Sequence, residues 1–512
     1  MQSPLHNVSR WIQERARLGP ERPAIVDDDR ALNFAALEDR VARAAAWLAA
    51  EGIGRGDRVA LVLGNRSAYL ELVFAAARLG AIAMPINTRL APPEVAQLLE
   101  DARPGLLIHE AALAPLIEAS LDQTRGGSPR AHAVGGSADA YEAALAALAP
   151  QSDIAAVSPE DPMILMYTSG TTGTPKGALL PHRKTFYNSL NAQIFFGCTQ
   201  EDRVLTVVPL FHSFGLLILA LPALYCGATV VLQTHFEPTA LWDAVARHRV
   251  TYFGGVPTMF GPLQEALDAG RPDVSSLRFL FTAGAAIPVE RIHAFEERGL
   301  RLKQGFGQTE TSILCCLDAA DAIRKAGSVG RPVFHAEVRI IREASLPLPP
   351  EEWQDCAFGE SGEIVVRGPI NMLGYWERPE ANAETLRGEW LRTGDLGSFD
   401  EEGFVTLTGR ARDMFISGGE NVYPRQVEAI YETHPDILEL AVIGVPHERW
   451  GETGHAYIVA RPGFELEPEA LRAWGRERLA SFKVPTTFEA VDELPKTITG
   501  KVQKFRLGSE NG

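Results

Sequence analysis

The sequence predicts an α/β protein: a large N-terminal domain of βαβ-type subdomains with a small β subdomain, followed by a small α+β domain. Three observations predict this organisation. Strand-like and helix-like segments alternate over residues 58–109, a second alternating run begins at Val204, and the pattern changes near Gly327 and again near Arg412. Alternating strands and helices favour parallel sheets whose faces are covered by helices.

The first run holds five segments in the order strand, helix, strand, helix, strand: 58–64, 69–79, 81–86, a helix opened by Pro93, and 105–108. Gly80 follows the first helix, and glycine is the usual residue at a left-handed helix end. A surface connection is expected at 126–137, where glycines gather.

The second run repeats the pattern from Val204, with a strand over 227–232 after a helix. Residues 205–236 contain no Asp, Glu, Lys or Arg, which is a feature of membrane spans. Pro209, His212 and Pro222 divide the stretch into short pieces, however, so buried strands and a buried helix are expected instead.

The β subdomain is predicted from three β segments at 336–341, 363–367 and 404–408, which Pro- and Gly-rich loops separate. We therefore expect an N-terminal domain over residues 1–411, with two βαβ-type subdomains to about 326 and the β subdomain over about 327–409. Residues 412–512 form the separate C-terminal domain. A chain of 512 residues is long enough for three or four such units.

Composition excludes some function classes. The formal net charge is −16, so electrostatics does not favour a nucleic-acid partner. The five cysteines show no metal or disulfide spacing, which predicts a reducing cytoplasm. The neighbouring Cys315 and Cys316 are expected to be buried, unreactive thiols. The first residues carry charges without an apolar segment, so neither a signal peptide nor a transmembrane segment is expected.

The stretch from Tyr167 to Gly177 reads Tyr-Thr-Ser-Gly-Thr-Thr-Gly-Thr-Pro-Lys-Gly and follows the apolar segment 163–166. Glycines let backbone N–H groups approach an anion, hydroxyls donate hydrogen bonds, and Lys176 adds a positive charge. The stretch therefore predicts a phosphate-binding loop rather than an ordinary polar turn. Since Gly177 follows the lysine where a Walker A loop has Ser or Thr, it is a different kind of phosphate loop.

Four further motifs follow in order: Gly-Phe-Gly-Gln-Thr-Glu at 305–310, Trp-Leu-Arg-Thr-Gly-Asp at 390–395, Gly-Arg at 409–410, and Pro-Lys-Thr-Ile-Thr-Gly-Lys at 495–501. With the loop, they make the chain resemble the adenylate-forming superfamily, which includes acyl- and aryl-CoA synthetases, luciferases and the adenylation domains of peptide synthetases. The resemblance covers nearly the whole chain. It implies that a carboxylic acid is activated by ATP as an acyl-AMP with loss of pyrophosphate, and that the acyl group then passes to coenzyme A.

The resemblance also implies a role for individual residues. Lys501 is the adenylation lysine between the incoming carboxylate and the α-phosphate, and His212 orients the substrate carboxylate. Thr309 bonds the α-phosphate, Glu310 holds Mg²⁺, and Asp395 and Arg410 reach the ribose hydroxyls. Phe306 stacks on adenine, where many relatives have tyrosine, with Gly284, Ala285 and Ala286 as the opposite wall. The loop that grips the β- and γ-phosphates comprises Thr168, Ser169, Gly170, Thr171, Thr172, Gly173 and Lys176.

In the resembled family the C-terminal domain is mobile: it swings about a hinge between the two half-reactions. Arg412 stands at the hinge position, and Ser417-Gly418-Gly419-Glu420-Asn421 matches the hairpin beside the pantetheine of CoA. Gly418 and Gly419 are therefore expected to contact CoA. A homodimer remains open at this stage.

The acid is expected to be hydrophobic, either a medium- or long-chain fatty acid or an aryl acid. Gly254, Gly255 and Gly307, with Phe214, Val256 and Ile313, predict an open apolar acyl pocket, and acetate-specific relatives have Trp where Gly307 stands. No basic residue in these stretches is placed to pair a second carboxylate. Two alternatives stay open: an adenylation enzyme that loads a carrier protein or amine, and a non-catalytic nucleotide-binding protein.

Overall fold

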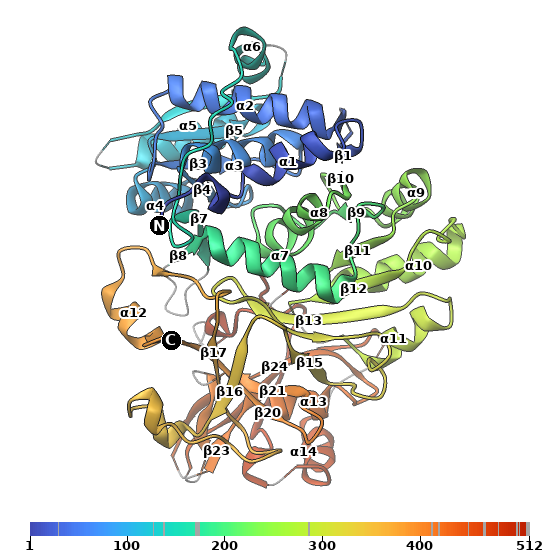
Figure 1. The fold of residues 1–512 in the computed structure, drawn as a ribbon. Coiled ribbons are helices and arrows are strands. Elements are labelled where there is room, and N and C mark those ends of the chain that lie inside the picture. Colours follow the sequence, from blue (N-terminus) through green and yellow to red (C-terminus); the bar gives the residue numbers. More distant parts are fainter. Residues whose placement is uncertain are drawn as a thin grey trace. The chain divides into compact units, whose positions relative to one another are not determined.

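The structure is a computed structural model, and the chain divides into two compact units (Figure 1). Unit 1 comprises Met1–Ala326, Pro332–Glu337 and Arg367–Glu389; unit 2 comprises Gly327–Arg331, Val338–Val366 and Trp390–Gly512. Within them the structure describes residues 1–28, 30–125, 127–136, 139–168, 175–284, 287–410, 413–417, 420–448, 450–463, 467–479, 481–497, 500 and 502–507. The two units are fewer than the three or four that chain length alone predicts. The domain boundary expected near Arg412 stays a prediction.

The first sheet of unit 1 has the strand order β18-β8-β7-β4-β3-β5-β6. Its strands are β3 (Arg58–Val62), β4 (Ile82–Pro85), β5 (Leu106–Glu110), β6 (Arg130–Val134), β7 (Pro162–Thr168), β8 (Lys176–Pro181) and β18 (Gly374–Tyr375). The pairs among β3 to β7 are parallel, whereas β8 is antiparallel to both β7 and β18. The expected parallel sheet is confirmed, with one correction: 126–137 is not only a connection, because edge strand β6 lies within it.

Five helices belong to this half of unit 1: α2 (Phe34–Ala50), α3 (Ser67–Leu79), α4 (Pro92–Ala102), α5 (Ala114–Gln123) and α6 (Ala140–Ala147). The predicted end of α3 is confirmed, since Gly80 caps it in the left-handed conformation at φ 72°. α3 is buried along almost its whole length, and α4 packs Val95, Leu98 and Leu99 into the apolar core beneath the sheet. Burial of these apolar faces, more than helix propensity, stabilises the layer.

The second sheet of unit 1 runs in the order β2-β1-β10-β9-β11-β12-β13-β14. Its strands are β1 (Pro23–Val26), β2 (Ala31–Asn33), β9 (Arg203–Thr206), β10 (Thr229–Leu232), β11 (Tyr252–Gly255), β12 (Phe279–Ala283), β13 (Leu302–Gln308) and β14 (Ser312–Leu317). The strands from β1 to β13 in this order pair in parallel, whereas β2 and β14 pair antiparallel at the two ends. The predicted second βαβ run is therefore confirmed.

Helices of this half include α1 (Arg10–Leu18), α7 (His182–Phe196), α8 (Leu221–Cys226), α9 (Pro238–His248), α10 (Phe260–Gly270) and α11 (Val289–Glu296). Helix α12 (Pro379–Thr385), later in the chain, packs against β18 of the first sheet. The uncharged stretch 205–236 is divided into β9, a π-helical segment η3 (Phe214–Ala220), α8 and β10, as predicted. Within the part of the chain that the structure describes, no helix is long and apolar enough to cross a membrane. α7, the long green helix in Figure 1, packs against β8, β14 and η3.

Unit 2 contains two sheets. The first has the order β16-β17-β20-β21-β15, with β15 (Ser328–Pro332), β16 (Glu337–Ile341), β17 (Gly362–Arg367), β20 (Trp390–Phe399) and β21 (Val405–Arg410). The second has the order β23-β22-β25-β24 with β26 beside β25, and comprises β22 (Phe415–Ser417), β23 (Glu420–Val422), β24 (Ile437–His447), β25 (Gly451–Ala460) and β26 (Thr487–Ala490). Helices α13 (Pro424–Tyr431) and α14 (Pro468–Arg476) supply Val427, Tyr431 and Leu471 to its core. The predicted β and α+β elements are confirmed.

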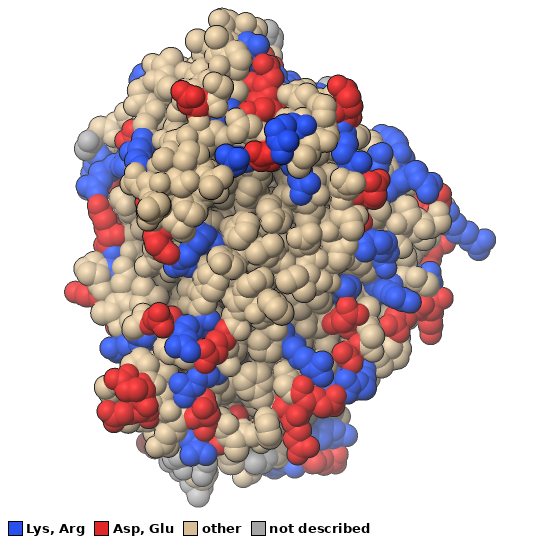
Figure 2. Space-filling model, viewed as in Figure 1, with Lys and Arg blue, Asp and Glu red and all other residues tan. Residues whose placement is uncertain are grey.

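Acidic and basic side chains are interspersed over the face of the molecule in Figure 2, without a large field of one sign. The five cysteines are free, and Cys315 is fully buried, which raises the pKa of its thiol above the usual range. A buried thiol with a raised pKa is unreactive, as the sequence predicted for this residue.

Candidate active site

A tight hairpin in unit 1 presents two of the predicted site residues, Thr309 and Glu310, between β13 and β14. The strands close with Gln308 opposite Ser312, and a bulge lies between Phe306 and Gly307. The turn is compact: a Cβ atom on Gly307 would lie 1.8 Å from the carbonyl oxygen of Ser312. Glycine is therefore required for the hairpin to close as it does.

A buried lysine anchors this hairpin from α7. Lys184 is fully buried, and its Nζ donates hydrogen bonds to Ser312 Oγ at 2.6 Å and to the carbonyl of Ile370 at 2.7 Å. Burial lowers the pKa of Lys184 well below its usual value, while the negative charge of Glu310 opposes that shift. Asn188, one turn further along the helix, accepts a hydrogen bond from the backbone N–H of Ile313. The hairpin is thus held rigidly against α7.

Tyr375, which was not predicted from the sequence, contacts both Glu310 and Lys176. The hydroxyl of Tyr375 donates to Glu310 Oε1 at 2.9 Å, and Lys176 Nζ lies 5.4 Å from the centre of the Tyr375 ring. Thr168 lies opposite Lys176 in the β7–β8 pair, at the two ends of the predicted phosphate loop. The structure therefore brings together Thr168, Lys176 and Glu310. Tyr375 belongs to a strand of two residues, too short to give a periodic signal.

The predicted carboxylate-orienting residue, His212, lies just before the π-helical segment η3. Its Nε2 is buried and has no hydrogen-bond partner among the described residues. Burial lowers the pKa of His212 from 6.5 to about 4, and the positive charge of Arg89 acts in the same direction. His212 is therefore neutral near pH 7 and offers a buried ring nitrogen. Its neighbour Ser213 lies with Oγ 3.5 Å from Thr309 Oγ1, which places His212 beside the hairpin.

The open acyl pocket predicted from three glycines stays a prediction, and the structure shows which protein atoms lie beside those glycines. A Cβ on Gly254 would lie 2.9 Å from a ring carbon of Phe214, and one on Gly255 would lie 3.3 Å from Met259 Cε. Gly254 and Gly307 therefore leave no room for a side chain without a shift of their neighbours, whereas the contact at Gly255 is only tight. By contrast, a Cβ on exposed Gly284 would meet only Val256 within 4 Å among the described atoms. The role of Gly284 as a wall of the adenine site stays a prediction.

Phe306, the predicted adenine-stacking residue, lies half-buried on β13 opposite Cys315. The structure places it on the strand that ends at the Thr309–Glu310 turn, in the same unit as Gly284. Its stacking role stays a prediction.

Unit 2 brings together the two predicted ribose ligands. Asp395 on β20 lies opposite Arg410 on β21, and Arg410 Nε forms an ion pair with Asp395 Oδ1 at 2.9 Å. The Asp395 side chain is 6% exposed, so its carboxylate is held in a fixed position. In the C-terminal part of this unit, β22 and β23 pair with Ser417 opposite Glu420, which confirms a hairpin there.

Several predicted site residues lie outside the described residues, and their roles stay predictions: Ser169, Gly170, Thr171, Thr172, Gly173, Ala285, Ala286, Arg412, Gly418, Gly419 and Lys501.

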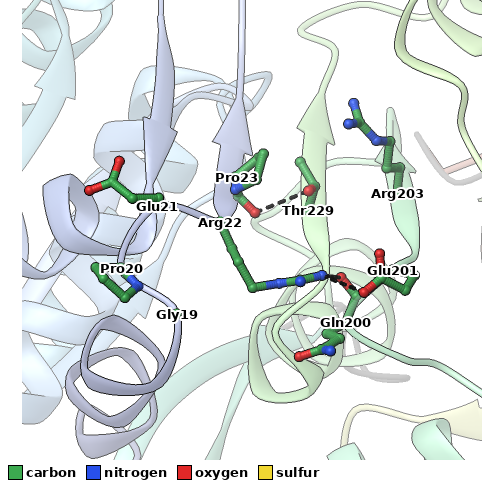
Figure 3. Close-up of a pocket in the computed structure, with 9 residues that line it drawn as sticks. All are labelled: Gly19, Pro20, Glu21, Arg22, Pro23, Gln200, Glu201, Arg203 and Thr229. Carbon is green, nitrogen blue, oxygen red and sulfur yellow. Dashed lines mark hydrogen bonds and ion pairs between the residues drawn. The ribbon is translucent and has the colours of Figure 1, made fainter.

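A separate surface pocket of 430 Å³ lies between the loop after α1 and the starts of β1, β9 and β10 (Figure 3). Arg22 crosses it and pairs with Glu201 at 2.9 Å, as the dashed line shows. Its lining contains none of the site residues predicted from the sequence. The exposed ion pair already neutralises the charge of Arg22, so we assign this pocket no role in the chemistry.

Comparisons with known proteins decide the family. A model of the AMP-binding enzyme family matches residues 12–376, and one of the AMP-binding enzyme C-terminal domain matches residues 426–501. The chain belongs to the AMP-binding enzyme family. It is 40% identical over 495 residues to a feruloyl-CoA synthase of Amycolatopsis sp., covering 96% of this chain and 97% of the relative. It is also 39% identical over 509 residues to the indoleacetate–CoA ligase of Aromatoleum aromaticum, covering 97% and 96%.

Among solved structures, the fold is similar to the o-succinylbenzoate coenzyme A synthetase from Bacillus subtilis in complex with ATP and magnesium ion. The TM-score is 0.85 at 32% identity, covering 97% of this chain and 99% of the other. This AMP-binding enzyme is an acyl-CoA synthetase, an acid–thiol ligase that uses ATP.

The residues present also fit a magnesium ion brought in with ATP. No group of three or more His, Cys, Asp or Glu side chains able to hold a metal occurs among the described residues. Mg²⁺ characteristically binds through one or two carboxylates together with substrate phosphates and waters. A single oriented carboxylate such as that of Glu310 suits this mode.

Buried histidines predict how stability depends on pH. His182 is 1% exposed, its Nδ1 accepts a hydrogen bond from the backbone N–H of Val8, and burial lowers its pKa from 6.5 to about 4. Because the unfolded chain binds a proton in this range and the folded chain does not, stability is lost as the pH falls from 6.5 towards 4. From His182 alone the loss reaches about 3 kcal/mol.

The measurement is the melting temperature between pH 7.5 and pH 4.5, for the wild type and for His182→Gln. We expect the wild-type melting temperature to fall steeply below pH 6.5, and the fall to be shallower in the variant, which has no proton to gain. Parallel curves for the two proteins would contradict the assignment.

Proposed function

We propose that this acyl-CoA synthetase activates an acid in which a short chain joins an aromatic ring to the carboxylate. The observation that supports adenylate chemistry is that Tyr375 contacts both Lys176 and Glu310. These residues lie at the Thr309 hairpin, next to an uncharged His212. Cationic and hydrogen-bonding groups aimed at a triphosphate are what adenylate formation requires, because two anions must meet.

In the first half-reaction a carboxylate oxygen of the acid attacks the α-phosphorus of ATP, an acyl-AMP forms, and pyrophosphate leaves. Lys176 and the loop that begins at Thr168 hold the leaving phosphates, and Thr309 bonds the α-phosphate. Neutral His212 can donate one ring N–H hydrogen bond to the carboxylate without adding charge. Mg²⁺, when bound with ATP, neutralises phosphate charge, and Glu310 is the residue that would hold it. Asp395 and Arg410 would fix the ribose.

In the second half-reaction the thiol of coenzyme A attacks the acyl carbonyl, a thioester forms, and AMP leaves. The hairpin β22–β23 is the element expected to lie along the pantetheine, and Gly418 and Gly419 are the residues expected to contact it. This role rests on the resemblance of residues 417–421 to the family hairpin. We further propose a cytoplasmic location, which the free cysteines support. Sedimentation analysis would test the further proposal that the protein forms a homodimer.

The acid class is supported by the names of two relatives, which act on feruloyl and indoleacetate groups. Both acids carry an aromatic ring on a short linker. The apolar rings near His212 suit such a group: Phe214 packs edge-on against Phe281 at 5.6 Å between ring centres, and Phe211 lies 4.8 Å from the His212 ring. Apolar and aromatic walls with a few polar groups are typical of ligand sites.

A panel of acids tests the proposal, scored by AMP release that depends on both ATP and CoA. The panel comprises cinnamic-type and indoleacetic acids, straight-chain acids from six to eighteen carbons, and o-succinylbenzoate. We expect kcat/KM for the best aryl acid to exceed that of the best straight-chain acid at least about tenfold, the scale of a few apolar contacts. A straight-chain acid that is turned over best would overturn the aryl assignment and leave the ligase class intact. Because Arg89 acts electrostatically on His212, o-succinylbenzoate also tests whether a second carboxylate is tolerated.

A further inference from the structure

Tyr375 is placed by backbone contacts that leave it little freedom. Its N–H donates to Asn382 Oδ1 at 2.6 Å, and the Asn382 side-chain amide donates back to the Tyr375 carbonyl at 2.9 Å. Tyr375 lies opposite Ala178 in the β18–β8 pair, and the next residue, Trp376, donates its N–H to the carbonyl of Gly177. Strand β18 is thus fastened to β8, the strand that begins with Lys176.

The side chain of Tyr375 then makes two different contacts with predicted site residues. Its hydroxyl donates to Glu310 Oε1 at 2.9 Å. Its ring faces Lys176 Nζ at 5.4 Å, within the range of a cation–π contact. One residue therefore touches both the carboxylate expected at the metal and the lysine expected at the leaving phosphates.

The contact with Glu310 matters because a carboxylate can rotate. A hydroxyl that occupies a lone pair on Oε1 fixes the plane of the carboxylate and leaves Oε2 directed elsewhere. Partners of this kind orient metal ligands, and their removal typically costs about 10- to 100-fold in metal affinity. The hairpin itself is already anchored by Lys184, so Tyr375 is the contact that fixes the Glu310 carboxylate group.

We propose that Tyr375 is a positioning residue for ATP activation: its hydroxyl orients Glu310 toward Mg²⁺, and its ring holds Lys176 toward the leaving phosphates. The inference rests on the proposed function, because the roles of Glu310 and Lys176 are part of it. It makes a separable prediction, since the hydroxyl and the ring act on different partners.

The experiment is calorimetric titration of ATP into the enzyme, with Mg²⁺ and with excess EDTA. Tyr375→Phe keeps the ring and removes the hydroxyl, so the gain in ATP affinity that Mg²⁺ provides should fall about tenfold. Its affinity for ATP in EDTA should stay unchanged. Tyr375→Leu removes the ring as well, so its affinity in EDTA should also fall, by about two- to fivefold.

A double-mutant cycle shows whether Tyr375 acts through Glu310. In a Glu310→Gln background, Tyr375→Phe should cause no further loss of the magnesium-dependent gain, because the group it orients has lost its charge. Equal losses in both backgrounds would overturn the proposal. Tyr141→Phe is the matched control: it removes a tyrosine–carboxylate hydrogen bond of 2.7 Å, to Glu71, away from the predicted site. It should lower the melting temperature without changing the effect of Mg²⁺.

The outcomes separate this inference from the proposed function. If the wild type gains ATP affinity from Mg²⁺ and Tyr375→Phe gains as much, the positioning role is wrong and the ligase function stands. If the wild type binds no ATP under either condition, the proposed function fails first. A Tyr375→Phe protein that melts well below Tyr141→Phe but keeps the full magnesium effect would show that the tyrosine is only structural.

Discussion

Replacement of Lys501 by alanine is expected to slow acyl-AMP formation at least about a hundredfold, the scale for removal of a key transition-state donor. The lysine is expected to bridge the carboxylate and the α-phosphate while negative charge accumulates between them. Thiolysis of supplied acyl-AMP needs no such bridge and should survive. Pyrophosphate exchange measures the first half-reaction, and acyl-CoA formation from synthetic acyl-AMP measures the second. Lys501 lies outside the described residues, so this expectation comes from the motif at 495–501.

Lys496 in the same motif provides the control. Its Nζ pairs with Glu439 at 2.5 Å, so its charge is already neutralised within unit 2. Lys496→Ala should leave pyrophosphate exchange within about threefold of the wild type, since exposed ion pairs contribute little. If Lys501→Ala slowed both half-reactions equally, the bridging role would be refuted.

Asp395→Asn is expected to lower kcat/KM for ATP about a hundredfold. The carboxylate can accept a hydrogen bond from each of the two ribose hydroxyls, whereas asparagine offers a single acceptor and no charge. A hydrogen bond to a charged group contributes about 1.5–3 kcal/mol, which corresponds to this factor. The measurement is AMP release at varied ATP with saturating acid and CoA, and the loss should fall mainly on KM for ATP.

Asp202 is a closely matched control in unit 1. It pairs with Arg278 at 3.0 Å and its side chain is 5% exposed, against 2.9 Å and 6% for Asp395 with Arg410. Asp202→Asn therefore breaks an equivalent buried ion pair at a position with no predicted nucleotide contact. It should lower the melting temperature and leave KM for ATP unchanged. A similar rise in KM in both variants would mean that Asp395 acts only on stability.

Much of the fold could be predicted because local signals agree with burial. The strands β3, β4 and β5 are apolar runs at regular spacing. Gly80 ends α3 and Gly227 ends α8, each with a left-handed cap, at φ 72° and 80°. Edge strand β6 was missed because it is only partly buried and its sequence, Arg130 to Val134, lies among turn residues. The β segments within residues 327–410 form one compact unit with the C-terminal residues, and this grouping depends on long-range contacts that no local sequence pattern encodes.

The site was predictable where chemistry is concentrated in short motifs, and unpredictable where it depends on packing. Thr309 and Glu310 stand in one motif, and the structure places them in one turn. Tyr375 reaches Glu310 across 65 positions of sequence, and Arg89 influences His212 from a distant loop. What lies beside the glycines at 254, 255 and 307 was not predictable, because a sequence shows that a side chain is small, not what fills the space beside it.

The pairing of β18 with β8 has a consequence for synthesis. Unit 1 is discontinuous: residues 367–389 belong to it, although the chain has by then already made part of unit 2. Until Gly374 and Tyr375 leave the ribosome, β8 remains an uncovered edge, and Glu310 lacks its hydrogen-bond partner. Pairing across so long a sequence separation is slow to form. The nascent protein therefore completes unit 1 only after three-quarters of the chain has been translated, so a chain that ends at residue 360 would expose the unpaired edge of β8 and leave Glu310 without Tyr375.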